Sequence, residues 1–131
     1  MQISNIKDQS QAQRSKIEVK YRAFYLSLDI IKFIAHLSLK LEIRIICDQL
    51  IRSVTSIGAN IVEAKSSSSK REFLNYFQIA LKSCNETKYW LALLRELTPD
   101  NKEIINNFID ETEQIGKIIA SSVLTMKNKR L

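Results

Sequence analysis

Apolar residues recur along the first half of the chain at steps of three and four, the spacing that lines one face of an α-helix. Two such series are Ile17, Tyr21, Phe24, Leu28, Ile31 and Ala35, followed by Ile43, Ile46, Leu50, Val54, Ile57 and Ile61. They predict helices over about residues 15–37 and 41–65. Residues 1–14, which precede the first series, are expected to form a mobile N-terminus.

The pattern leaves the boundary between these two helices open. Ala35, Leu39 and Ile43 continue the same spacing, and neither glycine nor proline separates the two series. Ser38 is a candidate cap for a second helix. The alternative is one helix of about 50 residues, which is longer than a typical globular helix.

A polar turn, Lys65-Ser-Ser-Ser-Ser-Lys-Arg71, separates the second helix from a third over about residues 70–97. Ser69 and Glu72 have the spacing of a capping box. Thr98 and Pro99 then predict the N-cap and first position of a fourth helix over about 99–127. The inward positions of these two helices are Phe73, Phe77, Ala80, Cys84, Thr87, Leu91 and Leu94, then Ile105, Phe108, Ile109, Thr112, Ile115, Ile119, Ser122 and Met126.

Four helices joined by short turns predict an all-α fold, an antiparallel up-down-up-down four-helix bundle that forms one domain over residues 1–131. The composition agrees, because the chain has only two glycines and one proline. Hairpin turns draw on these residue types, so a β-sandwich or barrel is excluded.

Groups that could perform catalysis are scarce in this sequence. His36 is the only histidine, and Cys47 and Cys84 are too far apart in sequence for a CxxC site. We expect both cysteines to be buried thiols in a reducing cytoplasm. The acidic cluster at Asp110, Glu111 and Glu113 is interpreted as a solvated helix face. No Gly-rich phosphate loop or G-x-S-x-G turn occurs, so we expect no enzymatic activity, no metal and no cofactor.

The longest stretch without a charged residue, Ser53 to Val62, is ten residues long. A helix that spans a bilayer needs about 20. The sequence therefore predicts a cytoplasmic protein without a membrane partner.

Positive charge is concentrated in the first half of the chain. The net charge is +6, and residues 1–40 hold seven Lys and Arg against three acids, whereas the last 60 residues are neutral overall. Such a balance is compatible with phosphate contacts to RNA or DNA, although solvated surface charge is an equally good interpretation of any single residue. The candidate nucleic-acid-binding residues are Lys20, Arg22, Arg44, Arg52, Lys65, Lys70 and Arg71.

The third helix carries a second apolar strip beside its inward face. Ile79, Trp90, Leu93 and Leu97 form this strip. Contiguous apolar patches commonly mark partner surfaces, so the strip is a candidate oligomer interface. The alternative is that a neighbouring helix of the same bundle covers it.

One segment carries a more specific pattern. Gln49-Leu50-x-Arg52-Ser53, then Ser56-Ile57-x-Ala59-Asn60-Ile61-x-Glu63, then Lys70-x-Glu72-Phe73, and finally Ser83 with Glu86 follow one another in order. This pattern resembles the bacterial four-helix bundle family of 23S ribosomal RNA intervening-sequence proteins, which is similar to the accessory variability determinant of diversity-generating retroelements.

The resemblance implies a break between the first two helices, a homopentameric barrel with a basic surface, and nucleic-acid binding, with a reverse transcriptase as a possible protein partner. The chain departs from the family at Gly58, where proline is usual, and at Ala64, where glycine is usual. We therefore expect a straight second helix without a glycine-type end. Asn60, Glu63 and Glu72 are interpreted as structural.

Two hypotheses follow. The first is an oligomeric nucleic-acid-binding protein that is not an enzyme. The second is a scaffold that docks a polypeptide partner on the Ile79 and Trp90 strip without touching nucleic acid.

Overall fold

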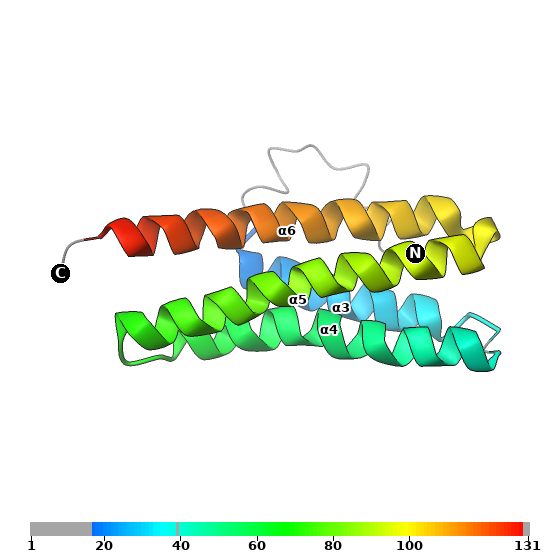
Figure 1. Cartoon of the computed structure of the whole chain (residues 1–131), viewed down its shortest axis with the longest axis horizontal. Coiled ribbons are helices and arrows are strands. Elements are labelled where there is room, and N and C mark those ends of the chain that lie inside the picture. Colours follow the sequence, from blue (N-terminus) through cyan, green and yellow to red (C-terminus); the bar gives the residue numbers. More distant parts are fainter. Residues whose placement is uncertain (1–16, 39, 130–131) are drawn as a thin grey trace.

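The computed structural model describes residues 17–38 and 40–129, and within them the chain forms four α-helices and one short 3₁₀ turn, with no strand. The expected mobile N-terminus, residues 1–14, lies outside the described residues. In the labels of Figure 1 the elements are α3 (Val19–Ile34), α4 (Leu41–Lys65), α5 (Lys70–Leu97), the 3₁₀ turn η1 (Pro99–Asn101) and α6 (Lys102–Asn128).

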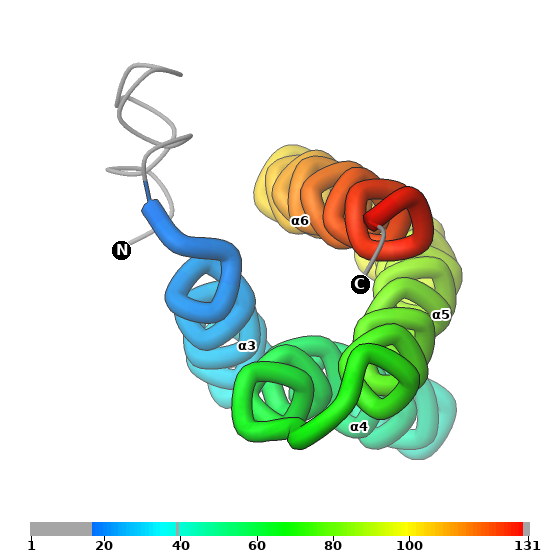
Figure 2. Tube along the Cα trace, turned by 90° about the vertical axis from the view of Figure 1, so that its left-hand side faces the viewer, coloured from blue at the N-terminus to red at the C-terminus, as the bar shows by residue number. Residues whose placement is uncertain are grey.

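The helices lie side by side along the long axis of the molecule (Figure 1). Viewed end-on, α4 lies between α3 and α5, and α6 lies on the other side of α5 (Figure 2). The α4–α5 and α5–α6 pairs make the most extensive contacts, and α3 packs on α4 more than on α6. The contact between α3 and α6 is therefore the weakest side of the helix arrangement.

Most of the apolar positions predicted for α4, α5 and α6 point into a common core. Leu50, Val54, Ile57 and Ile61 of α4 are completely buried, as are Leu91 and Leu94 of α5 and Ile105, Ile115 and Ile119 of α6. Phe108 stands against Phe33 of α3, with ring centroids 5.5 Å apart. The series of steps of three and four in these helices thus correctly identified the buried face.

In α3, by contrast, the apolar series that predicts the helix lies on the outward side, away from the core. Tyr21 and Phe24 are 51% and 59% exposed, and a different set of residues, Ala23, Leu26, Ile30 and Phe33, is buried. The helix therefore has two apolar faces, of which the bundle covers one. Spacing reveals that a face exists but does not say which face meets the core.

The first two helices are separate. Helix α3 ends at Ile34 and α4 begins at Leu41, as the family resemblance implies. Ser38 does not cap α4, because the N-cap is Lys40 and no side chain bonds the first turn. The helix runs without a break through Gly58 and ends at Lys65, with Ser66 in the right-handed helical region. No described residue has a positive φ, so this end is not of the glycine type.

The predicted caps of the last two helices have different outcomes. Ser69 caps α5 as expected, since its hydroxyl accepts a hydrogen bond of 3.1 Å from the backbone N–H of Glu72. The prediction that Thr98 caps the fourth helix is wrong. Its hydroxyl donates backward to the carbonyl of Leu94 at 2.8 Å, and Pro99 opens the 3₁₀ turn. Helix α6 consequently begins at Lys102.

Both cysteines are buried free thiols, as predicted. Burial, reinforced by the neighbouring carboxylate of Asp48, raises the pKa of Cys47 to about 11. Burial raises the pKa of Cys84 to about 12, partly offset by Lys88. Both thiols are therefore protonated at neutral pH.

We predict that neither thiol of the native protein reacts with a disulfide reagent such as DTNB at pH 8, because thiolate is the reactive form and both groups are also shielded from solvent. Both should react within minutes in urea. Since the folded pKa lies above the unfolded value, the contribution of the two thiols to the free energy of unfolding should stay level below about pH 8.5 and decrease as pH rises further. Rapid reaction of the folded protein would contradict this placement.

We also predict that Gly58→Ala stabilises the protein. A Cβ at this position would meet Ala23 at 3.6 Å, an ordinary contact distance, so α3 need not move. Alanine in a helix interior is favoured over glycine by about 1 kcal/mol. Urea unfolding should show this gain, and the matched control Ala59→Gly, one residue along and exposed, should show a similar loss. A loss of stability in Gly58→Ala would mean that α3 and α4 pack more tightly than described.

Candidate nucleic-acid interface

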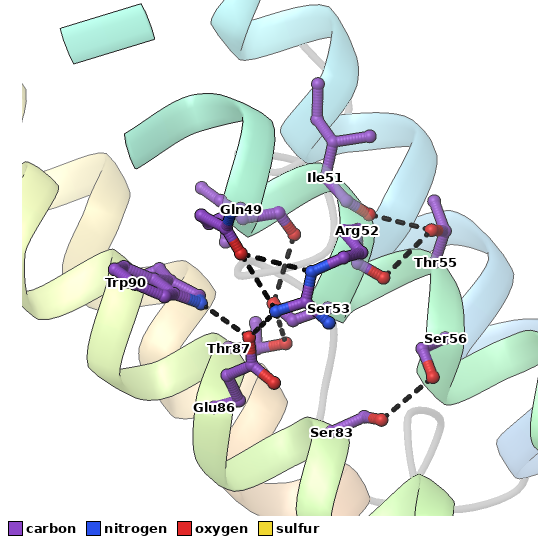
Figure 3. Close-up of polar contacts among 11 residues, drawn as sticks. Gln49, Ile51, Arg52, Ser53, Thr55, Ser56, Ser83, Glu86, Thr87 and Trp90 are labelled. Atoms are coloured by element: carbon purple, nitrogen blue, oxygen red, sulfur yellow. Dashed lines mark hydrogen bonds and ion pairs between the residues drawn. The ribbon is translucent and has the colours of Figure 1, made fainter. Parts of the chain in front are cut away.

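Short hydroxyl side chains pair across the contact between α4 and α5 (Figure 3). Ser83 Oγ of α5 donates to Ser56 Oγ of α4 at 2.9 Å. Thr87 Oγ1 donates to Ser53 Oγ at 2.9 Å, and Ser53 Oγ in turn donates to the carbonyl of Leu50. Residue numbers rise along α4 as they fall along α5, so the two helices run in opposite directions. We refer to Ser53, Ser56, Ser83 and Thr87 as the hydroxyl seam.

Asn60 extends the hydroxyl seam along α4. Its Nδ2 donates to the carbonyl of Ser56 at 2.8 Å and to Ser56 Oγ at 3.0 Å. The amide thus serves α4 itself, which agrees with the structural interpretation of Asn60.

A charged network lies at the rim of the hydroxyl seam and engages Arg52. The Arg52 guanidinium forms an ion pair with Glu86 and donates to Gln49 Oε1 at 2.9 and 3.1 Å. Trp90 Nε1 donates to the same Glu86 carboxylate at 2.8 Å, as Figure 3 shows. The charge of Arg52 is therefore balanced within the fold, although its side chain is 57% exposed.

Arg22, one of the candidate nucleic-acid-binding residues, lies inside the fold rather than on a free surface. Its side chain is only 5% exposed, and it points toward α6. Nε and Nη2 donate to the two carboxylate oxygens of Glu111 at 2.9 and 2.6 Å, and Nη2 also reaches Gln114 Oε1. The sequence pattern places Arg22 among the candidate surface charges, whereas in the structure it forms an internal ion pair between α3 and α6.

Asp29 is a second charged residue on the same side of α3, two turns from Arg22. It is 4% exposed, and no hydrogen bond or ion pair involves it within the part of the chain that the structure describes. Burial raises the pKa of this carboxyl group, and the nearby charge of Lys32 partly opposes the change. Two of the buried residues of α3 are therefore charged.

The remaining predicted basic residues do not form one patch. Arg44 is exposed near the start of α4, about 30 Å along the helix from Lys65. Lys20 lies near the start of α3, 3.8 Å from a carboxylate oxygen of Glu18 and 5.1 Å from the centre of the Tyr21 ring. Arg44 is therefore separated from the basic residues of the serine turn, residues 65–71, whereas Lys20 lines a surface depression together with Val62 and Glu63 of α4.

The serine turn does gather positive charge at one end of the molecule. Lys65 ends α4, and Lys70 and Arg71 open α5. The end of α6 lies beside this turn, because Lys70 Nζ donates to the backbone carbonyl of Lys129 at 3.0 Å. Figure 2 views the molecule from this end, with the turn and the end of α6 nearest the viewer.

Lys127 and Lys129 accordingly join the three basic residues of the turn. We call Lys65, Lys70, Arg71, Lys127 and Lys129 the basic end. The first turns of α5 also line a surface depression that includes Lys70, Arg71, Asn75 and Gln78. The basic character of the C-terminal tail, which includes these two lysines, is visible in the sequence. Only the fold shows that this tail lies beside the serine turn.

The apolar strip of α5 is more covered than predicted. Trp90 and Leu93 are half-buried and Trp90 packs against the core, while Ile79 and Leu97 are 38% and 47% exposed. The centre of the strip is therefore partly covered, and the two outer residues are open.

No helix within the described residues combines the length and apolar composition that a membrane span requires. In the same part of the chain, no group of three or more His, Cys, Asp or Glu side chains is placed to hold a metal ion.

We predict that Glu111→Leu lowers the free energy of unfolding by about 3 kcal/mol, because the buried Arg22 guanidinium then has no carboxylate partner. The double variant Arg22→Met/Glu111→Leu should recover much of the loss, since no buried charge remains unpaired. Glu113→Leu, an exposed position on the same helix, is the control and should change stability by less than about 0.5 kcal/mol. Additive effects of the two single changes in urea unfolding would contradict a coupled pair.

Comparison with known proteins places the chain in a family. Residues 15–121 match the family described as 23S rRNA-intervening sequence protein. A solved structure from Bacteroides thetaiotaomicron, described as a protein of unknown function from the S23 ribosomal protein family, is 31% identical with a TM-score of 0.72. The alignment covers 81% of this chain and 98% of that one. No match was found among curated proteins. The chain therefore belongs to the 23S rRNA-intervening sequence protein family.

Proposed function

We propose that the protein is an oligomeric nucleic-acid-binding accessory protein of the cytoplasm, without enzymatic activity, that contacts the phosphates of RNA or DNA through the basic end. The observation that carries this proposal is the convergence of α4, α5 and α6 at the serine turn. These helix ends carry five cationic residues, Lys70 reaches the backbone of Lys129, and the nearest carboxylates along the chain are Glu63 and Glu72.

The local geometry favours an anionic partner. Lys65, Arg71, Lys127 and Lys129 are exposed, and none has an ion-pair partner among the described residues. The Glu72 carboxylate accepts a hydrogen bond from Ser68 at 3.0 Å, so it is engaged within the turn. The amino end of α5 adds the positive end of a helix dipole. Phosphate contacts of this kind position a backbone without reading its sequence.

Family membership supports RNA as the first nucleic acid to test, because the family is described by reference to 23S rRNA. The sequence resemblance favours a homopentameric ring whose unit is an antiparallel up-down-up-down four-helix bundle. In a ring, each copy would repeat the basic end, so a patch of five residues becomes an extended positive surface.

We predict that Lys65→Gln/Lys70→Gln/Arg71→Gln weakens RNA binding at least tenfold at about 50 mM salt. If each residue neutralises one phosphate, the slope of log K against log salt should become less steep by about 0.7 to 0.9 for each phosphate that is no longer neutralised. Fluorescence anisotropy with labelled RNA and DNA of equal length, at four or more salt concentrations, measures both quantities.

The matched control is Lys40→Gln/Arg44→Gln/Lys102→Gln, which removes the same charges from exposed positions at the opposite end of the molecule. It should bind as the wild type does. Equal weakening by both triple variants would show that net charge alone drives binding, and undetectable wild-type binding at low salt would refute the proposal.

A further inference from the structure

Helices α3 and α4 enclose an open groove of about 540 Å³, which we call the α3–α4 groove. Small-molecule sites have volumes of about 300–1,000 Å³, and their walls are mostly apolar with a few polar groups. The groove matches this description. Its apolar lining consists of Phe24, Leu28 and Ile31 of α3 and Gly58, Ala59 and Val62 of α4.

Exposed aromatic rings stand on α3 beside this groove. Tyr21, Phe24 and Tyr25, which we call the aromatic ridge, are 51%, 59% and 51% exposed. The rings of Phe24 and Tyr25 contact each other edge to face, with centroids 5.3 Å apart. Every nucleobase has a π-face, so exposed aromatic side chains stack on the bases of a single strand whatever their sequence. The aromatic ridge therefore has the chemistry of a stacking platform.

The charge of the groove suits a base better than a phosphate. Within the described part of the chain, its charged lining residues are Lys20 and Glu63, one of each sign, and Lys20 also lies 3.8 Å from a carboxylate oxygen of Glu18. The lining hydroxyl groups of Ser27 and Thr55 both donate to backbone carbonyls of α4. A phosphate meets no positive excess here, whereas a neutral planar ring meets apolar walls.

The groove continues into the basic end. Gly58, Val62 and Lys65 follow one another at steps of four and three, so they lie on one face of α4. Gly58 and Lys65 are about 10 Å apart along the helix axis. Nucleotides of a stacked strand are about 3.4 Å apart, so about three of them span this distance. Figure 2, which views the molecule from the basic end, shows the start of α3 beside the last turns of α4.

We propose that the α3–α4 groove and the aromatic ridge bind unpaired bases of a nucleic-acid strand whose phosphates contact the basic end. This inference rests on the proposed function and specifies its substrate as single-stranded. The bases of a duplex are paired and stacked on one another, so they cannot stack on the aromatic ridge. The basic end supplies the attraction that depends on salt, and the aromatic ridge selects an unpaired strand.

Fluorescence anisotropy with three labelled probes that carry equal numbers of phosphates tests this division. The probes are an unstructured RNA, an RNA hairpin of the same length and a ribose-phosphate strand of that length without bases. At about 50 mM salt the wild type should bind the unstructured RNA at least tenfold more tightly than the other two probes.

Phe24→Ala should weaken binding of the unstructured RNA about fivefold to a hundredfold, and it should leave binding of the strand without bases unchanged. The slope of log K against log salt should stay as in the wild type, because the variant removes no charge. Tyr21→Ala should act in the same direction. Circular dichroism should show unchanged helix content in both variants, because both side chains are exposed.

Tyr89→Ala is the matched control, since Tyr89 is as exposed as Phe24, at 59%, but lies on α5. It should bind all three probes as the wild type does. Equal affinity of the wild type for the three probes, full affinity of Phe24→Ala or an equal loss in Tyr89→Ala would overturn the inference. A change of particle mass in Phe24→Ala, measured by light scattering, would show that a polypeptide covers the aromatic ridge and would also overturn it.

The same probes separate this inference from the proposed function. Salt-dependent binding that the Lys65→Gln/Lys70→Gln/Arg71→Gln variant loses, without any preference for the unstructured RNA, refutes the base site and retains the basic end. A preference for the unstructured RNA that survives in this variant and does not depend on salt refutes the basic end instead. Absence of binding to every probe refutes both.

Discussion

The close approach of α4 to α5 through short hydroxyl side chains is the constraint on which the rest of the structure depends. A buried hydroxyl group without a partner costs about 1–3 kcal/mol, so each Ser or Thr of the hydroxyl seam must meet its partner across the contact. Thr87 therefore has to stand opposite Ser53, and Ser83 opposite Ser56. A slip of one helical turn would break both pairs, whereas an all-aliphatic contact would tolerate it.

This fixed alignment also positions the basic end. Because the contact sets how far α4 and α5 extend together, it places the serine turn at one end of the molecule, where α6 also finishes. It also directs the opposite side of α4 toward α3, where Gly58 allows Ala23 to approach. The segment with the family pattern, from Gln49 to Glu86, thus contains the residues that align α4 with α5. Its pattern reflects packing rather than a set of catalytic residues.

The sequence predicts most accurately the residues that are both regularly spaced along a helix and buried in the core. The core positions of α4 and α5 and the Ser69 cap follow directly from spacing and residue type. Arg22 was placed on the surface because a helix pattern records which residues share a face, but not which neighbour that face meets. The return of Lys129 to the serine turn depends on the relative lengths of α5 and α6, which no local pattern encodes. The end of α3 was available only from family resemblance.

The burial of both thiols has a practical consequence for physical studies of this protein. With Cys47 and Cys84 protonated and shielded in the core, the wild-type surface offers no native sulfur to a thiol-specific dye or spin label. A single cysteine introduced at an exposed position could then be labelled selectively without first removing the native pair. The surroundings of that position would become measurable in an otherwise unaltered chain.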